Sequence, residues 1–409
     1  MSERSRTQVT YHYELLRAGT AGVLESASGT FLLLVALRWY GAGAFAKAFI
    51  AAGGSLGLLL SPVVVEITTR WQVAPSRAAS MILAFGSSLF LVAAIFPTFP
   101  VYVFCSVAGM ATSAAIIPLL TQMYQENYPE NQRGRLFSKT IMLRIASTAA
   151  FSKVAGDWLT LHLQSFPFLL GIFGASLALA SFCLWHCPTY PIPVDDSAHP
   201  LRSLRFIKED AIFRRTLICW MLMGFANLMM IPLRVEYLGN PKYNQHLTVA
   251  TIALLTGVIP NLARLALSPV WGHLFDHMNF FALRVTLNIG FAIGILAFFT
   301  THSLAGMICG AVVFGISNAG GDVAWSLWVT KFAPPERVAD YMAIHTGLTG
   351  LRGVLAPLVA FYMVTRLSLG TLALISTGLI ALATMLLIPE IRIGAKGRVK
   401  PALTEEVSD

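Results

Sequence analysis

The sequence predicts an all-α integral membrane protein with twelve transmembrane helices in two pseudo-symmetric six-helix bundles. The first observation is composition: hydrophobic residues make up 56% of the 409 residues and charged residues 12%, whereas soluble domains are about 25% charged. The second is a series of apolar runs, each near the roughly 20 residues that a helix needs to cross a bilayer. The third is an internal repeat at about half the chain length, which indicates two related bundles.

The repeat is clearest in two stretches that end apolar runs. GLLLSPVVVEITTR in the first half is echoed by RLALSPVWGHLFDH in the second, so that Ser61-Pro62 recurs as Ser268-Pro269. A repeat of this length is too long for a solenoid unit and fits two fused bundles. Because each half carries its own set of long apolar runs, these bundles are expected to lie in a membrane.

Each half contains six apolar runs, and each run predicts one spanning helix because backbone polar groups in lipid must be satisfied within the segment. The first six runs cover residues 16–38, 43–68, 78–97, 101–124, 137–160 and 165–186. The second six cover 216–237, 248–272, 281–300, 303–331, 339–365 and 369–389. The expected domains are therefore a tail at 1–15, a bundle at 16–186, a linker at 187–215, a bundle at 216–389 and a tail at 390–409.

Positive charge sets the expected orientation. Most Lys and Arg residues lie in the two tails, the linker and the loops at 69–77, 125–139, 273–284 and 331–339. Since short cytoplasmic loops carry the excess of Lys and Arg, we expect the linker and both termini to be cytoplasmic, in a plasma (inner) membrane. The net charge of +9 is spread over these loops rather than gathered in one stripe, so we expect no nucleic-acid partner.

Ionisable residues inside the spans mark candidate functional positions, because each costs at least ~2.5 kcal/mol at a helix centre on insertion scales. The third, sixth, ninth and twelfth runs show none in their apolar interiors, so we expect these four helices to face lipid. The candidates in the other runs are Glu25, Arg144, Arg264, Asp322, His345 and Arg352, with Asn227 as an additional hydrogen-bonding residue.

Counting helical rise from the cytoplasmic ends places Glu25 and Arg144 at similar depth, so these two side chains can pair. Asp322 can pair with either Arg264 or Arg352. Static contacts between helices explain any one of these residues equally well. As a set, they favour a polar cavity between the helices, because static contacts do not need so many charges.

The chain resembles the major facilitator superfamily in its two halves of six spans, its central linker and a short motif. Members carry a G-x-L-x-D-R-like motif after span 2 and often again after span 8. Here the second copy runs from Gly272 to His277 and includes Asp276, whereas the first copy, VEITTR, lacks the Gly and the Asp. Arg133 and Arg135 resemble the family's R-G-R element between spans 4 and 5. The resemblance implies that Gly272, Asp276, Arg133 and Arg135 form a cytoplasmic gate.

The resemblance implies alternating access, in which the two halves rock about a central site. We therefore predict a secondary active transporter of a small organic solute, with proton coupling through Glu25 or Asp322. Arginines outnumber acids in the spans, which favours an anionic or zwitterionic substrate. Efflux or uniport of apolar compounds is an alternative, based on the Met-rich and aromatic stretch Trp220 to Ile231.

A third alternative is a membrane-embedded sensor or enzyme. The sequence gives it little support, since no span or loop gathers a Ser, His and Asp, a metal-ligand cluster or a phosphate-binding glycine loop. We therefore expect no enzymatic activity, no cofactor and no metal, and a monomer whose partners are its solute, protons and the lipid bilayer.

Overall fold

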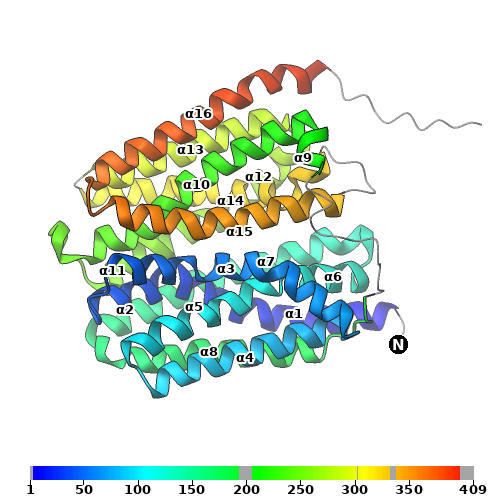
Figure 1. Ribbon diagram of the computed structural model, residues 1–409, viewed down its shortest axis with the longest axis horizontal. Helices are drawn as coiled ribbons and strands as arrows, with labels where there is room; N and C mark the ends of the chain where they lie inside the picture. Colours follow the sequence, from blue (N-terminus) through cyan, green and yellow to red (C-terminus); the bar gives the residue numbers. More distant parts are fainter. Residues whose placement is uncertain (1–2, 193–204, 302, 332–337, 397–409) are drawn as a thin grey trace, which may run out of the picture.

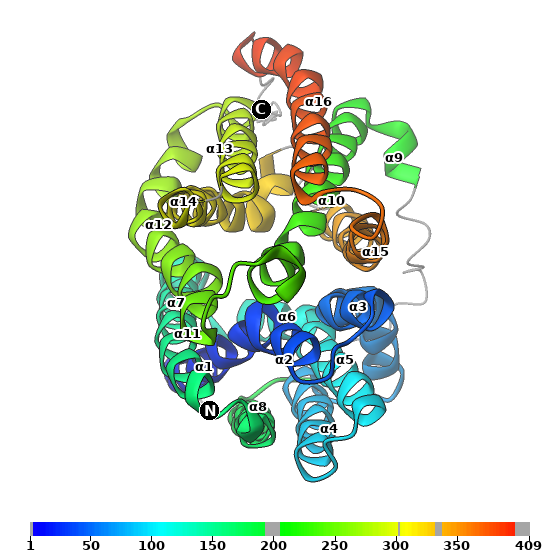
Figure 2. The same cartoon turned by 90° about the vertical axis from the view of Figure 1, so that its left-hand side faces the viewer.

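The computed structural model describes residues 3–192, 205–301, 303–331 and 338–396, which form two helical bundles stacked side by side (Figure 1). Seen end-on, the helices of the first half lie below those of the second half (Figure 2). We call the end at which α1 begins and α16 ends the terminal side, and the opposite end the distal side. Eleven helical segments in the described part are long and apolar enough to cross a membrane.

The N-terminal half contains the first six predicted spans. They are α1 (Glu3–Ser26) continued by the π-helix η1 (Ala27–Phe31) and α2 (Leu32–Arg38), α3 (Ala44–Arg70), α4 (Pro75–Ile95), α5 (Phe99–Ala115) with α6 (Ile117–Asn127), α7 (Glu130–Leu161), and α8 (Phe166–Trp185) after the 3-10 turn η2 (Leu163–Ser165).

The C-terminal half repeats this plan. After the short α9 (Arg205–Glu209) it contains α10 (Ala211–Gly239), the turn η4 (Pro241–Tyr243), α11 (Val249–Ala253) continued by the π-helix η5 (Leu254–Val258) and α12 (Ile259–His277), α13 (Phe280–Thr300), α14 (Leu304–Leu327) with η6 (Trp328–Lys331), α15 (Val338–Met363) and α16 (Leu369–Lys396).

The fifth predicted span, α7, is not among the eleven apolar segments. It is 32 residues long and therefore long enough to cross a bilayer, but it carries Arg144, Lys153 and Asp157. The twelve-span prediction differs from the apolar count by this one helix, whose charges are the reason that composition alone misses it.

Some predicted boundaries need correction. Helix α1 begins at Glu3, so most of the segment read as a polar tail is the start of the first helix. Likewise α10 begins at Ala211, inside the predicted linker, because the Asp210 side chain accepts a hydrogen bond from the Phe213 amide and caps the helix. Helix α16 continues to Lys396, past the predicted end of the last span.

The repeated Ser-Pro pair has a structural reason. Pro62 and Pro269 lie inside the equivalent helices α3 and α12, where proline removes one backbone hydrogen bond. In α3 the Ser61 hydroxyl donates to the Leu58 carbonyl at 2.8 Å, which is the carbonyl that the missing amide of Pro62 leaves free. In α3 the pair therefore keeps the helix polar groups satisfied while the chain continues through the bilayer, whereas in α12 the Ser268 hydroxyl donates to the Arg264 carbonyl at 2.6 Å.

Four helices form the outer surface, as their apolar sequences predict. Helix α4 packs on α8, and α13 packs on α16. Large side chains on these helices are exposed, among them Phe85, Phe168, Ile289 and Met385, as expected for a surface that faces lipid. Helix α13 departs from the prediction on its inner face, where Arg284 is 1% exposed.

Candidate functional site

A charge network connects the two halves in the interior of the molecule. The Arg264 guanidinium on α12 donates through Nη1 to Glu25 Oε1 on α1 at 2.5 Å and through Nε to Asp322 Oδ2 on α14 at 2.6 Å. The other oxygen of Glu25 lies 3.1 Å from Nε of Arg144 on α7. Two carboxylates and two guanidiniums therefore alternate in one chain of contacts, and their charges sum to zero.

The network confirms two of the pairings left open by the sequence. Glu25 contacts Arg144, and Asp322 contacts Arg264 rather than Arg352. Its geometry adds what the sequence did not show, namely that Glu25 also contacts Arg264 across the two halves. Within each half one acid is paired with one arginine, and the Glu25 to Arg264 contact joins these two pairs.

The network is enclosed only in part. Arg264 is nearly buried, with 7% of its side chain exposed, while the side chains of Glu25, Asp322 and Arg144 keep 30%, 36% and 37% exposed. The carboxylates are therefore accessible to a proton or a small solute, although the guanidinium between them is held in place. A further hydrogen bond fixes the position of this guanidinium, because Nη1 of Arg264 also donates to Asn261 Oδ1 at 3.2 Å.

Irregular helix lies next to the network in both halves. The π-helix η1 begins two residues after Glu25, and η5 ends shortly before Arg264 in the equivalent part of the second half. The hydroxyls of Thr30 in η1 and Thr256 in η5 are 2.8 Å apart, so the two π-helices contact each other across the halves. Single π turns inside α-helices are frequent at functional sites, and here each is next to one charge of the network.

Close packing of α1 and α7 places Glu25 beside Arg144. Gly22 allows it, because a Cβ added there lies 2.4 Å from the Arg144 carbonyl oxygen and 2.6 Å from Ser147 Cβ. Helix interiors otherwise disfavour glycine by about 1 kcal/mol, so the close approach explains its presence.

We expect Gly22→Ala to lower the stability of the folded protein by about 1–3 kcal/mol, because overpacking pushes α7 away from α1. The measurement is the thermal unfolding midpoint of the purified protein in detergent. Gly54→Ala on α3 is the matched control, since a Cβ there meets nothing within 4 Å and alanine favours a helix. Equal midpoints for the two variants would contradict this packing argument.

The distal side of the interface is closed by a second set of contacts between the halves. Lys47 Nζ on α3 donates to Glu236 Oε2 on α10 at 2.7 Å, and both residues are buried at 6% and 2% exposure. Arg38 donates to the carbonyls of Gly239 and Leu247 at 3.0 and 2.8 Å. These residues lie at the edges of the apolar runs, where the sequence alone does not show whether a charged side chain is buried or solvated.

The long seams between the halves are also covered. Helix α3 packs against α15, and α7 packs against α11 and α12 (Figure 2). With both seams and the distal side closed, we infer that the exposed part of the charge network faces the terminal side.

A small cavity lies between the halves on the distal side of Glu25. Its volume is about 50 Å³, and its lining surface is about half polar and half apolar. The lining residues are Ser28, Gly29, Leu33, Ala51, Ser55, Leu228, Ile231, Pro232, Gly353 and Pro357. A volume of this size holds a few waters at most, so the two halves lie close together at this point.

Three further candidates from the sequence lie outside the charge network. Arg352 on α15 donates to the Trp220 carbonyl on α10, and His345 is fully buried among the rings of Trp220, Trp325 and Trp328. Asn227 on α10 has a buried Oδ1 for which the described residues provide no hydrogen-bond donor. These residues therefore stay candidates without a place in the network.

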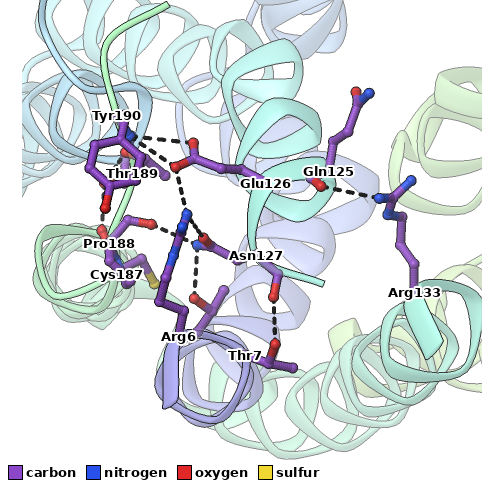
Figure 3. A network of polar contacts seen from close by, with 12 residues as sticks. Arg6, Thr7, Gln125, Glu126, Asn127, Arg133, Cys187, Pro188, Thr189 and Tyr190 are labelled. Atoms are coloured by element: carbon purple, nitrogen blue, oxygen red, sulfur yellow. Dashed lines mark hydrogen bonds and ion pairs between the residues drawn. The ribbon is translucent and has the colours of Figure 1, made fainter. Parts of the chain in front are cut away.

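The candidate gating residues lie at the terminal side. Arg133 donates to the carbonyls of Gln125 and Tyr128, at 3.1 and 3.3 Å, and so caps the end of α6 (Figure 3). Arg135 is exposed on α7. Gly272 is part of α12 with open space around it, and the side chain of Asp276 lies outside the described residues. The gating role of these four residues remains a prediction.

Beside Arg133, a polar network ties the start of α1 to the ends of α6 and α8 (Figure 3). Arg6 pairs with Glu126 at 2.7 Å, and the Asn127 side chain bonds to Arg6 and to the Pro188 carbonyl. Burial raises the pKa of the Tyr128 phenol and of the Cys187 thiol in this region, so both groups are neutral at ordinary pH. The network fixes the N-terminal half as a unit and carries no free acid at its centre.

Comparison with known proteins gives the fold. The sequence matches no known protein family and no curated protein. Solved structures match over nearly the whole chain. The nucleoside transporter NupG is 11% identical, and the match covers 96% of this chain and all of that one with a TM-score of 0.70. A D-xylose-proton symporter is 17% identical, and the match covers 95% of this chain and 98% of that one with a TM-score of 0.69. A POT family transporter in complex with a thioalcohol-conjugated peptide is 11% identical, and the match covers 95% of this chain and 96% of that one with a TM-score of 0.69.

Proposed function

Because the chain has the fold of the major facilitator superfamily, we propose that it is a secondary active transporter that moves a small anionic or zwitterionic organic solute, coupled to protons, by alternating access. The observation that carries this proposal is the position of Arg264. Its guanidinium holds one carboxylate of each half, so a competing anion at this point changes the contact between the halves.

The proposed binding step begins with the solute carboxylate. It enters from the terminal side, which we propose to be cytoplasmic, and takes the place of Glu25 between Arg144 and Arg264. Both guanidiniums are within 3.1 Å of Glu25 and can form charge-assisted hydrogen bonds with a carboxylate. The pair of Arg264 and Asp322 stays intact, because both residues belong to the second half.

Proton coupling follows from the displacement. Once Glu25 loses its two guanidinium partners in a partly desolvated site, its charged form is disfavoured and it takes up a proton. One negative charge has then arrived with the solute and one has been neutralised, so the site keeps its charge as the halves rock. A zwitterion adds an ammonium group, for which Asp322 is the available partner because a third of its side chain is exposed.

The first test is the thermal stability of the purified protein in detergent with organic anions, amino acids, sugars and lipophilic cations at two pH values, because a ligand of the folded state raises its stability. We expect stabilisation by one carboxylate-bearing class. It should be lost in Arg144→Ala and kept in Lys153→Ala, a matched control on α7 whose Lys153 to Asp157 pair is exposed. Stabilisation by every class or by none contradicts a carboxylate site.

The second test addresses the proton. In proteoliposomes with the solute found above, Glu25→Gln is expected to retain exchange of solute for solute but to lose accumulation driven by a pH gradient, because an amide takes up no proton. Asp322→Asn is tested in parallel. If both variants keep transport and its pH dependence, the proposed proton carriage is wrong.

Efflux or uniport of apolar compounds is the alternative, and the cavity between the halves gives it only limited support, because just about half of the lining surface is apolar. The Met-rich part of α10 gives less support, since Met223, Met229 and Met230 are at most 3% exposed and pack in the core. Stabilisation by lipophilic cations but not by organic anions in the first test would favour this alternative.

A further inference from the structure

A second group of buried basic side chains lies inside the C-terminal half, outside the charge network between the halves. It consists of Arg284 on α13, His345 and Arg352 on α15, and we call it the arginine–histidine cluster. The three residues are 1%, 0% and 6% exposed. Arg284 does not stand out in the sequence, because it lies at the start of a predicted span, next to the basic loop at 273–284.

Trp220 on α10 holds the cluster together. The Arg284 guanidinium stacks over its indole ring at 3.7 Å from the centroid, and Arg352 donates to its carbonyl oxygen. Gly224, one turn further along α10, provides the space: a Cβ there lies 2.1 Å from Nη1 of Arg352. The helix is therefore shaped to accept a guanidinium against its backbone.

The cluster contains polar atoms without a partner in the described part of the chain. These atoms are Nη1 of Arg284, Nε of Arg352 and both ring nitrogens of His345. Buried polar groups are otherwise almost always hydrogen-bonded, and an exception needs an explanation, of which a bound water or ion is one. Here the orphaned atoms include N–H donors on three side chains of two helices.

The charge of the cluster is not balanced by the described residues. No described carboxylate lies within the 4.0 Å ion-pair distance of Arg284 or Arg352. The buried Glu390 of α16 pairs instead with Arg215 at 2.9 Å. Two guanidiniums in a low-dielectric interior repel each other and each carries a desolvation cost, and one anion between them would offset both effects.

We propose that the arginine–histidine cluster binds one small inorganic anion of the chloride class within the C-terminal half. The size follows from the surroundings. Three tryptophan rings pack around His345, and the guanidiniums lie against Trp220 and Gly224, so the space left for a ligand is small. The bound anion connects α13 to α15, and both guanidiniums also contact Trp220 of α10, so the anion stabilises the packing of these three helices.

The test measures thermal unfolding of the full-length protein in detergent with chloride or bromide replacing gluconate at constant ionic strength. We expect a saturable rise of the unfolding midpoint with chloride and bromide but not with gluconate. Arg284→Gln should abolish the rise. Gly224→Ala, which displaces the Arg352 guanidinium, should weaken the apparent affinity by roughly tenfold or more, as expected for loss of a hydrogen bond to a charged group.

Arg264→Gln is the control that separates this site from the charge network. A chloride effect that persists in Arg264→Gln and is lost in Arg284→Gln supports the inference. An effect lost in Arg264→Gln and kept in Arg284→Gln places the anion between the halves and overturns it, as does an effect unchanged in both variants.

If Arg284→Gln does not fold, the wild-type protein decides the matter. Crystals grown in bromide are expected to show one anomalous peak within hydrogen-bond distance of Arg284, Arg352 and His345. Absence of this peak in crystals that diffract well enough to locate bromide elsewhere overturns the inference.

Discussion

Arg264→Gln is expected to abolish solute transport and to lower the stability of the folded protein by about 2 kcal/mol. Removing one partner of a buried ion pair costs about 3–5 kcal/mol, and the cost is smaller here because Glu25 and Asp322 keep about a third of their side chains exposed. Loss of transport has a separate cause, since the variant removes the guanidinium that contacts a carboxylate of each half.

The measurement for Arg264→Gln combines the thermal unfolding midpoint in detergent with solute uptake in proteoliposomes. Arg135→Gln is the stability control, because Arg135 is exposed at the terminal side and a surface substitution changes stability by about 0.5 kcal/mol or less. Addition of Glu25→Gln to Arg264→Gln should recover part of the stability but none of the transport. The second substitution removes one of the two carboxylates, those of Glu25 and Asp322, that lose their contact with Arg264. Full transport by Arg264→Gln would refute the proposed role of the network.

Lys47→Met is expected to produce the second large effect, a loss of about 3–5 kcal/mol in stability together with opening of the distal side. Lys47 and Glu236 form an ion pair at 2.7 Å in which both side chains are at least nine-tenths buried, and removal of one partner leaves an uncompensated buried charge. Since this pair joins α3 to α10 across the halves, its loss also removes a contact that holds the distal side closed.

The double variant with Lys47→Met and Glu236→Met provides the control for charge. Replacement of both ions of a buried pair by apolar residues of similar volume is often neutral or stabilising, so we expect the double variant to be more stable than Lys47→Met alone. A double variant as unstable as the single one would mean that packing of Lys47, and not its charge, holds the two helices together.

Opening is measured with a cysteine introduced by Ser28→Cys in the cavity between the halves, in a background with Cys309→Ser. The other four cysteines are buried and Cys309 is exposed, so the new thiol is the accessible one. A membrane-impermeant thiol reagent added from the distal side should label this thiol slowly in the otherwise unchanged protein and rapidly with Lys47→Met. Equal labelling rates would contradict the role of the ion pair as a distal closure.

Several parts of the site follow from the sequence, because charge is rare in lipid. Glu25, Arg144, Arg264 and Asp322 stand out in their apolar runs, and their depths along the helices predict the pairs within each half. Helix positions do not give the rotation of one half against the other. For that reason the sequence could not show that Glu25 contacts Arg264, or that Arg352 faces Trp220 instead of Asp322.

The residues that sequence reasoning missed lie where apolar runs begin and end. Arg284, Lys47 and Glu236 are each within a few residues of a helix end, where a charged side chain is ordinarily solvated or extends to the interface. Burial at these positions depends on what packs above them, which is a property of several helices at once. The pattern of apolar and polar residues along one helix therefore does not show whether a charged residue near its end is buried.

The sequence by itself determined the membrane class, the two related halves and the identity of the intramembrane charges, because hydropathy and spacing act along a single helix. Tertiary structure decided which charges meet, which side of the molecule is closed and where cations are buried without a described acid. Those outcomes depend on how the helices of both halves pack and on close approaches such as that at Gly22, and side chains on different helices become neighbours only after packing is complete.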